Sequence, residues 1–299
     1  MTAQTVHFLE GLHAGQLTPG LGQTSRLYSG GSFNWKKGHS AGDWNVFRFY
    51  TMPRDHAKQP GRIAPTAAER RRAWQVHIYT GSGAILAFVA GWAVIHGSDR
   101  LALAALFAAT LVDATDGVLA RRARVKEVLP EIDGGRIDDI VDYMTFVLIP
   151  MLLLEAAGGL YFAAVFPVVS VVLLSSLYGF VAPDAKTGDH FFTGFPSYWN
   201  IVVLYLLLFK VPPAANAVIL LALSGLVFVR IGWVYPSRTA ALQRTTLVLA
   251  AIWALLLAAI IWLWPSPPRW MAIGSLVFPV YYLVLSLVLH SRRAPVALR

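Results

Sequence analysis

The 299-residue sequence contains no cysteine and few charged residues. The absence of cysteine excludes disulfide bonds, thiolate-bound zinc, iron–sulfur clusters and catalysis by a thiol. Charged residues make up only 14% of the chain, whereas a soluble domain averages about 25%. This shortage of charge, together with a hydrophobic content of 56%, indicates an integral membrane protein.

Residues 1–72 lack any apolar run long enough to span a bilayer, and they are rich in Gly, Ser, Thr, Gln, His and Pro. They also lack the basic segment followed by an apolar core that marks a cleavable signal peptide. We expect a polar, poorly ordered N-terminal extension over residues 1–72 and a transmembrane domain over residues 73–299.

Long apolar runs fill the remainder of the chain, and several approach the ~20 residues that cross a bilayer as a helix. The expected fold is an all-α, polytopic membrane helical bundle with about eight transmembrane helices. The predicted spans are 74–96, 101–119, 135–157, 160–180, 197–211, 215–234, 244–264 and 270–290.

The net charge of +9 is distributed unevenly between the segments that join these spans. If the N-terminus is cytoplasmic, the inner segments near the spans hold thirteen Lys and Arg residues and the outer loops hold three. This asymmetry predicts that both termini are cytoplasmic. It also accounts for the basic composition without a nucleic-acid partner, and we expect none.

Four aspartates stand at the facing, cytoplasmic ends of the second and third predicted spans, in DATDGVLARR and DGGRIDDIVDY. Asp113 and Asp116 are three residues apart and Asp138 and Asp142 four apart, so each pair shares one face of a helix. Carboxylates this close to hydrocarbon repel one another, and oxygen ligands of this kind suit Mg²⁺ or Mn²⁺. We therefore expect two divalent ions between the helices.

Small and basic residues accompany these acids. Gly117 would let a ligand approach the helix backbone closely, and Arg121 offers a fork of donors for phosphate oxygens. Asp133 and Asp139 are interpreted as helix-cap or surface charges outside the site. Asp139 lies about 100° around the helix from Asp138.

These residues together resemble the signature of the CDP-alcohol phosphatidyltransferases, with the pattern Asp113-x-x-Asp116-Gly117-x-x-Ala120-Arg121 followed by Gly134-x-x-x-Asp138-x-x-x-Asp142. The twelve residues between Arg121 and Gly134 form a longer loop than is usual in that family. This loop, VHIYTGSG and FFTGFPSYWN resemble the corresponding stretches of bacterial phosphatidylcholine synthases.

The resemblance implies a role for each of these positions. Asp113, Asp116, Asp138 and Asp142 would bind the metal ions, and Asp142 would also act as the general base. The residues expected to line the nucleotide are Gly117, Ala120, Arg121 and Gly134. The implied reaction transfers the phosphatidyl group of CDP-diacylglycerol to choline and releases CMP.

A quaternary ammonium group such as that of choline binds to aromatic faces. The candidate choline contacts are Tyr143, Tyr198 and Trp199, although aromatic residues also form belts at membrane interfaces. His77 could also face the site, but packing is the default interpretation of this residue. Arg230 could hold a lipid phosphate, and a snorkelling side chain explains it equally well.

Two other functions remain open at this point. The acceptor could be serine, inositol or glycerol phosphate, and a protein of another class, a cation transporter, could also use membrane-embedded acids. The position of the acids at one end of the spans favours the transferase. The resemblance further implies a bacterial inner membrane, an active site at its cytoplasmic face and, as in many members of the family, a homodimer.

Overall fold

The computed structural model describes residues 64–182, 191–234, 239 and 242–292, all of which belong to one compact unit that covers residues 61–299. The elements follow one another as α1 (Ala67–Ile95), α2 (Asp99–Arg122), α3 (Val125–Val128), α4 (Gly134–Asp142), η1 (Tyr143–Leu148), α5 (Ile149–Ala156), α6 (Phe162–Val181), β1 (Phe191–Thr193), α7 (Trp199–Leu208), α8 (Pro213–Leu226), β2 (Gly232–Val234), α9 (Gln243–Trp262), α10 (Arg269–Ser275) and α11 (Val277–Ser291).

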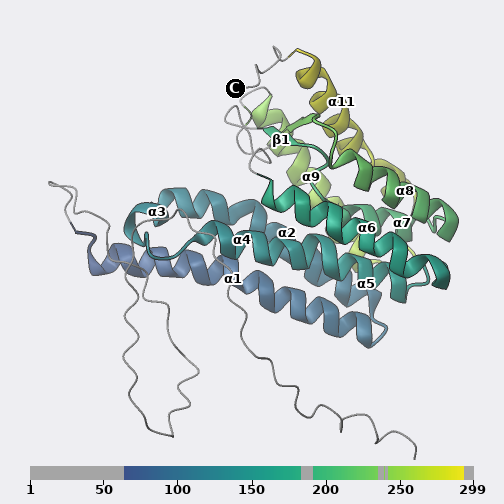
Figure 1. Cartoon of the computed structure of the whole chain (residues 1–299), viewed down its shortest axis with the longest axis horizontal. Coiled ribbons are helices and arrows are strands. Elements are labelled where there is room, and N and C mark those ends of the chain that lie inside the picture. The colour runs from purple at the N-terminus through teal and green to yellow at the C-terminus, as the bar shows by residue number, and fades with distance from the viewer. Residues whose placement is uncertain (1–63, 183–190, 235–238, 240–241, 293–299) are drawn as a thin grey trace, which may run out of the picture. The chain divides into compact units, whose positions relative to one another are not determined.

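The two longest helices, α1 and α2, lie side by side and make the most extensive helix–helix contact of the described chain (Figure 1). α1 also contacts the third rod, which is continuous from α4 through η1 to α5. Gly83 of α1 allows this close approach, because a Cβ at that position would collide with Val141 of α4. The missing side chain thus brings α4 against α1, and this contact helps to fix where the acids of α4 lie.

The third rod changes its hydrogen-bond pattern immediately after Asp142. Residues Tyr143–Leu148 form a π-helix, in which the N–H of Ile149 donates to the carbonyl of Met144, five residues earlier. Pro150 follows and has no N–H to donate to the carbonyl of Phe146, so a regular α-helix cannot continue through this point. The π-helix, which the sequence analysis does not predict, turns the side chains after Asp142 to new directions.

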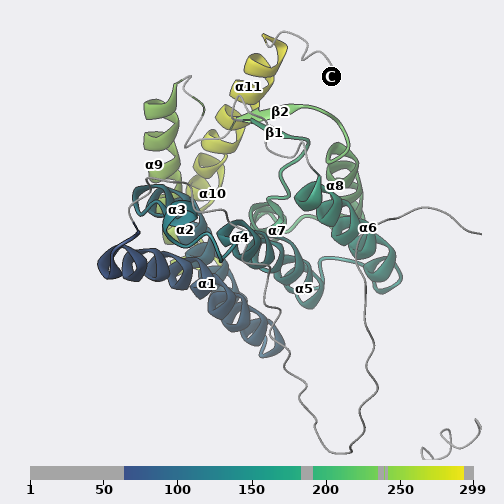
Figure 2. The ribbon, with the colours of Figure 1, turned by 60° about the vertical axis from the view of Figure 1, so that its left-hand side comes forward.

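The second half of the domain packs around the third rod (Figure 2). α7 contacts α5 and η1, α6 contacts η1 and α8, and α9 contacts α2. β1 and β2 form a short antiparallel pair, which lies beside α11 in both views (Figures 1 and 2). The two strands therefore link the α6–α7 and α8–α9 connections to the last helix.

The core and the outer surface are both apolar, as expected in a membrane. Leu153, Leu154 and Trp199 are fully buried among residues of α1, α2, α6 and α8. Large side chains such as Phe88 and Phe162 are instead exposed on the outside of the helices. A surface of this composition fits lipid rather than water, and the chain is an all-α, polytopic membrane protein.

Five helices of the described residues are long and apolar enough to cross a bilayer: α1, α2, α6, α9 and the pair formed by α10 and α11. The other three predicted spans coincide with the interrupted third rod and with the shorter apolar helices α7 and α8. The expected fold class is confirmed, and the number eight and the cytoplasmic position of both termini stay predictions.

The structure differs from three predicted boundaries. α1 begins at Ala67, so the helical domain starts before residue 73; residues 1–63 of the predicted extension lie outside the described part of the chain. The sixth predicted span does not reach residue 234, because α8 ends at Leu226 and Gly232–Val234 form β2. The last predicted span is divided at Leu276.

Candidate active site

Three of the four predicted metal ligands meet in space. One carboxylate oxygen from each of Asp113, Asp138 and Asp142 lies within 4.8 Å of the other two. The three side chains are half-buried and come from α2 and α4. Convergence of carboxylates from two helices is the arrangement that the sequence spacing predicts.

The orientation of α4 is set by its first turn. Asp133 is the N-cap, and its side chain accepts hydrogen bonds from the backbone N–H groups of Gly135 and Arg136, at 3.1 and 3.4 Å. This confirms the interpretation of Asp133 as a cap. From this start the helix places Asp138 and Asp142 one turn apart on a single face.

A cavity of about 720 Å³ opens beside the three aspartates. Asp116 lines the same cavity and is 6% exposed, but it is not within the group of three. Asp139 lines the cavity as well, so the expectation that it points away from the site is wrong. A cavity can contact side chains from more than one row of a helix surface. A rotation of about 100° from Asp138 therefore still leaves Asp139 at the cavity.

Gly117 and Arg121 both line the cavity, one turn apart on α2. A Cβ at Gly117 would stand 3.3 Å from Nη1 of Arg121. The absence of a side chain at Gly117 therefore leaves room for the Arg121 guanidinium, which extends beside the cavity. The sequence predicts that a ligand approaches the helix here, whereas in the structure the space holds a side chain of the type that binds phosphate.

Ala120 and Gly134 do not line the cavity. Ala120 packs against a small apolar cluster where α1 meets α3 and the residue after it, formed by Ala73, Val76, Val125, Val128 and Leu129. Gly134 touches His77 of α1, where an added Cβ would lie 2.9 Å from the imidazole Cε1. Both small residues allow close helix packing next to the site.

Of the three predicted choline contacts, the structure brings only Tyr198 to the cavity. Tyr143 donates a hydrogen bond to the carbonyl of Leu173 at 3.0 Å and packs edge-on against Phe180. Trp199 is fully buried, and its Nε1 donates to Oγ of Ser176 at 2.7 Å. The π-helix directs Tyr143 to α6, and the start of α7 directs Trp199 into the core.

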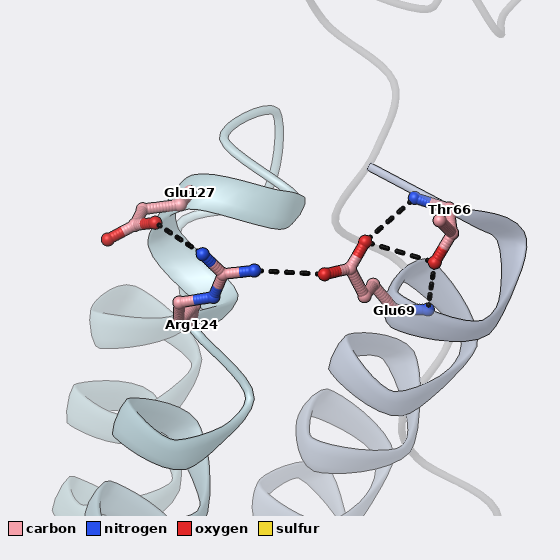
Figure 3. A network of polar contacts seen from close by, with 4 residues as sticks. All are labelled: Thr66, Glu69, Arg124 and Glu127. Carbon is pink, nitrogen blue, oxygen red and sulfur yellow. Dashed lines mark hydrogen bonds and ion pairs between the residues drawn. The ribbon is translucent and has the colours of Figure 1, made fainter. Parts of the chain in front are cut away.

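The loop between the acidic helices is attached to the beginning of α1. Arg124 donates to Oε1 of Glu69 at 2.9 Å and lies 3.8 Å from Glu127, while Thr66 and Glu69 cap α1 reciprocally (Figure 3). Arg70 forms a second ion pair with Glu131 at 2.6 Å. These contacts, together with the apolar cluster beneath them, fix the loop that joins α2 to α4.

The ionised loop residue Glu131 illustrates the electrostatics at this end of the protein. The pKa of Glu131 is lowered, first by a hydrogen bond from its own backbone N–H and then by Arg70.

Arg230, a residue that could have faced the site, is exposed in the α8–β2 connection and does not line the cavity.

The donor set is composed of oxygen atoms only and fits a hard divalent cation. Three carboxylates within 4.8 Å of one another suit Mg²⁺ or Mn²⁺, and histidine is absent from the group. The nearby Arg121 adds a positive charge at the cavity wall. Such an arrangement can hold a phosphorylated ligand and accept a proton from a hydroxyl group.

Comparison with known proteins identifies similar chains in several bacteria, although no family model matches the chain. A protein named phosphatidylcholine synthase from Legionella pneumophila is 40% identical over 167 residues, which is 56% of this chain and 66% of the relative. One of the same name from Legionella bozemanae is 46% identical over 139 residues, 46% of this chain and 64% of the relative.

The chain thus spans about two thirds of the length of the two Legionella relatives. A longer match occurs with the phosphatidylcholine synthase of Rhizobium meliloti, which is 32% identical over 219 residues. This match covers 73% of this chain and 91% of the relative. Identity of this degree over nearly the whole relative shows that the chain belongs to the phosphatidylcholine synthase family.

Proposed function

We propose that the protein transfers the phosphatidyl group of CDP-diacylglycerol to choline, forming phosphatidylcholine and releasing CMP. The observation that carries this proposal is the convergence of Asp113, Asp138 and Asp142 beside a cavity of about 720 Å³. Membership of the phosphatidylcholine synthase family supports the identity of the product.

The reaction forms one phosphorus–oxygen bond and breaks another. The choline oxygen attacks the phosphorus atom that carries diacylglycerol, and the bond from that phosphorus to the oxygen of CMP breaks. The proton of the choline hydroxyl passes to a carboxylate oxygen of Asp142, which acts as the general base. A general base of this kind contributes about 10²–10⁴ to the rate.

Asp113, Asp138 and Asp142 would hold Mg²⁺ or Mn²⁺, and Asp116, which lines the same cavity, would complete a site for two ions. Bound divalent ions would supply electrostatic stabilisation of the charge on the pyrophosphate and on departing CMP. The four side chains would orient these ions and keep them next to the reacting phosphate.

Arg121 and Gly117 are proposed to contact the nucleotide of the donor. Arg121 presents its guanidinium at the cavity wall, where it can donate to phosphate oxygens. Ala120 and Gly134 contribute indirectly, because their small size lets α1, α3 and α4 pack closely around this end of the cavity.

The protein is proposed to lie in the bacterial inner membrane with this site at the cytoplasmic face. The arginines near the site support that orientation, because Arg121 and Arg122 end α2 and Arg124 follows in the loop. An excess of basic residues is typical of cytoplasmic segments.

The function can be tested with membranes that contain the protein and CDP-diacylglycerol. Labelled choline, serine, inositol and glycerol phosphate are supplied separately, and the lipid products are identified. We expect phosphatidylcholine and release of an equal amount of CMP. Formation of a different phospholipid would show that the acceptor is wrong, and release of no CMP with any alcohol would contradict the transferase itself.

A further inference from the structure

Among the aromatic side chains that line the same cavity as the clustered aspartates, Tyr198, Trp233 and Tyr282 form one group. The ring of Tyr282 stacks on Trp233 with a centroid separation of 6.0 Å, and Tyr198 meets Tyr282 edge-on at 6.3 Å. These residues, called here the aromatic wall, come from the start of α7, from β2 and from α11. They adjoin one another although they are far apart in the sequence.

The aromatic wall is held in place by hydrogen bonds between β2 and α11, which lie next to each other (Figure 2). The hydroxyl of Tyr282 donates to the carbonyl of Val234 at 2.9 Å, and the N–H of Val234 lies 3.1 Å from Oγ of Ser286. The N–H of Gly232 donates to Nδ1 of His290 at 3.1 Å. The rings are thus fixed before any ligand arrives, which reduces the entropy lost on binding.

The segment before Tyr198 has an unusual backbone conformation. Gly194 has a φ of +76°, and a Cβ there would collide with the backbone of Val227. The buried Ser197 has a φ of +56°, which residues other than glycine rarely adopt. Such strain persists only where the surrounding structure maintains it, and here it sets the direction from which Tyr198 reaches the cavity.

A chain of contacts connects the aromatic wall to the proposed general base. Phe146 lies about one helical turn after Asp142 on the continuous third rod, and it also lines the cavity. Its ring centroid is 6.3 Å from that of Tyr198. The hydroxyl and the ammonium group of choline are separated by only two carbon atoms, so the ammonium group must bind near Asp142. Tyr198 is the member of the wall that contacts Phe146.

We propose that the aromatic wall receives the trimethylammonium group of the acceptor and thereby selects choline over neutral alcohols. The assignment rests on the proposed transfer to choline, and it adds the residues that recognise the acceptor. A cation over an aromatic ring is attracted by the negative face of the ring, most strongly for Trp and where water is excluded. Tyr198 and Trp233, rather than Tyr143 and Trp199, therefore carry the specificity.

The test compares choline with 3,3-dimethyl-1-butanol, an acceptor of similar shape in which carbon replaces the charged nitrogen. Replacing Tyr198→Leu or Trp233→Leu should lower the choline preference, measured as the ratio of the two kcat/KM values, by about tenfold. The KM for CDP-diacylglycerol should stay unchanged. Tyr198→Phe keeps the ring and should retain most of the preference for the cation.

Matched controls use aromatic residues outside the cavity. Tyr178→Leu and Trp270→Leu alter half-exposed and exposed side chains that do not line it, and both should keep the wild-type ratio. An unchanged ratio in the two wall variants, or an equal loss in the controls, would overturn the assignment. The assignment would also be overturned if Tyr198→Phe lowered the ratio of the two kcat/KM values as much as Tyr198→Leu does.

A binding measurement separates this inference from the proposed function. Tetramethylammonium chloride carries the cation but no hydroxyl, so it should raise the Tm of the purified protein more than KCl at equal ionic strength. The rise should disappear in Trp233→Leu and persist in Trp270→Leu. If the wild type makes no phosphatidylcholine but shows this pattern, only the reaction is wrong; absence of the rise in an active wild type refutes only the aromatic wall.

Discussion

The cavity has two faces that are built in different ways. Its acidic face consists of Asp113, Asp138 and Asp142, which lie on α2 and α4, two helices joined by a single connection that contains α3. The aromatic wall consists of Tyr198, Trp233 and Tyr282, which three separate segments supply. The first face is determined by spacing along helices and the second by tertiary contacts, so the two should respond independently to change.

Removal of divalent metal should distinguish the two faces most strongly, because it should stop the reaction at the acidic face and leave cation binding at the aromatic wall. EDTA should abolish phosphatidyl transfer, because the carboxylates of the acidic face have no reactivity toward the pyrophosphate without the ions they are proposed to hold. Addition of Mn²⁺ or Mg²⁺ should restore it, measured as labelled phosphatidylcholine. The rise in Tm caused by tetramethylammonium should persist in EDTA. Phosphatidyl transfer that continues in the chelator would contradict the metal site.

A substitution at the general base should give the next largest effect. Asp142→Asn should lower kcat by at least about 10²–10⁴, because it removes the proton acceptor and one proposed metal ligand. Tetramethylammonium protection should stay in place, because the aromatic wall is unaltered. Asp133→Asn makes the same chemical change at the N-cap of the same helix, where Asn serves as well as Asp, and should remain close to wild type. Full activity of the Asp142 variant would remove this residue from the mechanism.

The acidic face could be predicted from the sequence because helical geometry relates spacing to direction. Asp138 and Asp142 are four residues apart and do share a face, and Asp133 does cap α4. The failure at Asp139 has a simple cause, since the width of the cavity is not contained in helical spacing. The membrane class and the positions of most helices followed from composition and apolar length.

The aromatic wall could not be predicted in this way. Trp199 and Tyr198 are adjacent in the sequence, yet Trp199 is buried in the core and Tyr198 lines the cavity. Which of them reaches the cavity depends on Ser197, whose φ is positive, and on where α7 begins. The available signal was Gly194, because a glycine between aromatic residues can mark a required backbone conformation.

Gly194 offers a way to disturb the aromatic wall alone. Gly194→Ala forces a side chain into the backbone of Val227 at a positive φ, and it should cost about 1–3 kcal/mol of stability. The KM for choline should rise, while metal-dependent binding of CDP-diacylglycerol should be kept. Gly225→Ala is the control, since nothing lies within 4 Å of the added Cβ and the residue is helical. An equal rise of KM for both substrates would show that the faces are coupled.

The ion pairs between α1 and the loop that joins the acidic helices should have the smallest effect (Figure 3). Glu69→Gln removes the charge opposite Arg124 but keeps an oxygen that can cap Thr66. The pair is exposed and screened by solvent, so the coupling energy between Glu69→Gln and Arg124→Gln should be small. It is measured by unfolding the two single variants and the double variant.

A fall in pH should weaken the second ion pair of this region, between Arg70 and Glu131. The pKa of Glu131 is lower in the folded protein than its usual value, so its contribution to stability is present above that value and is lost as the pH falls through the folded pKa. Near neutral pH, Glu131→Gln should thus have a small cost that salt reduces, whereas in acid it should have none. A tenfold loss of transfer in this variant at neutral pH would show that the loop positions the acidic face, and that the buried cluster beneath it is not sufficient.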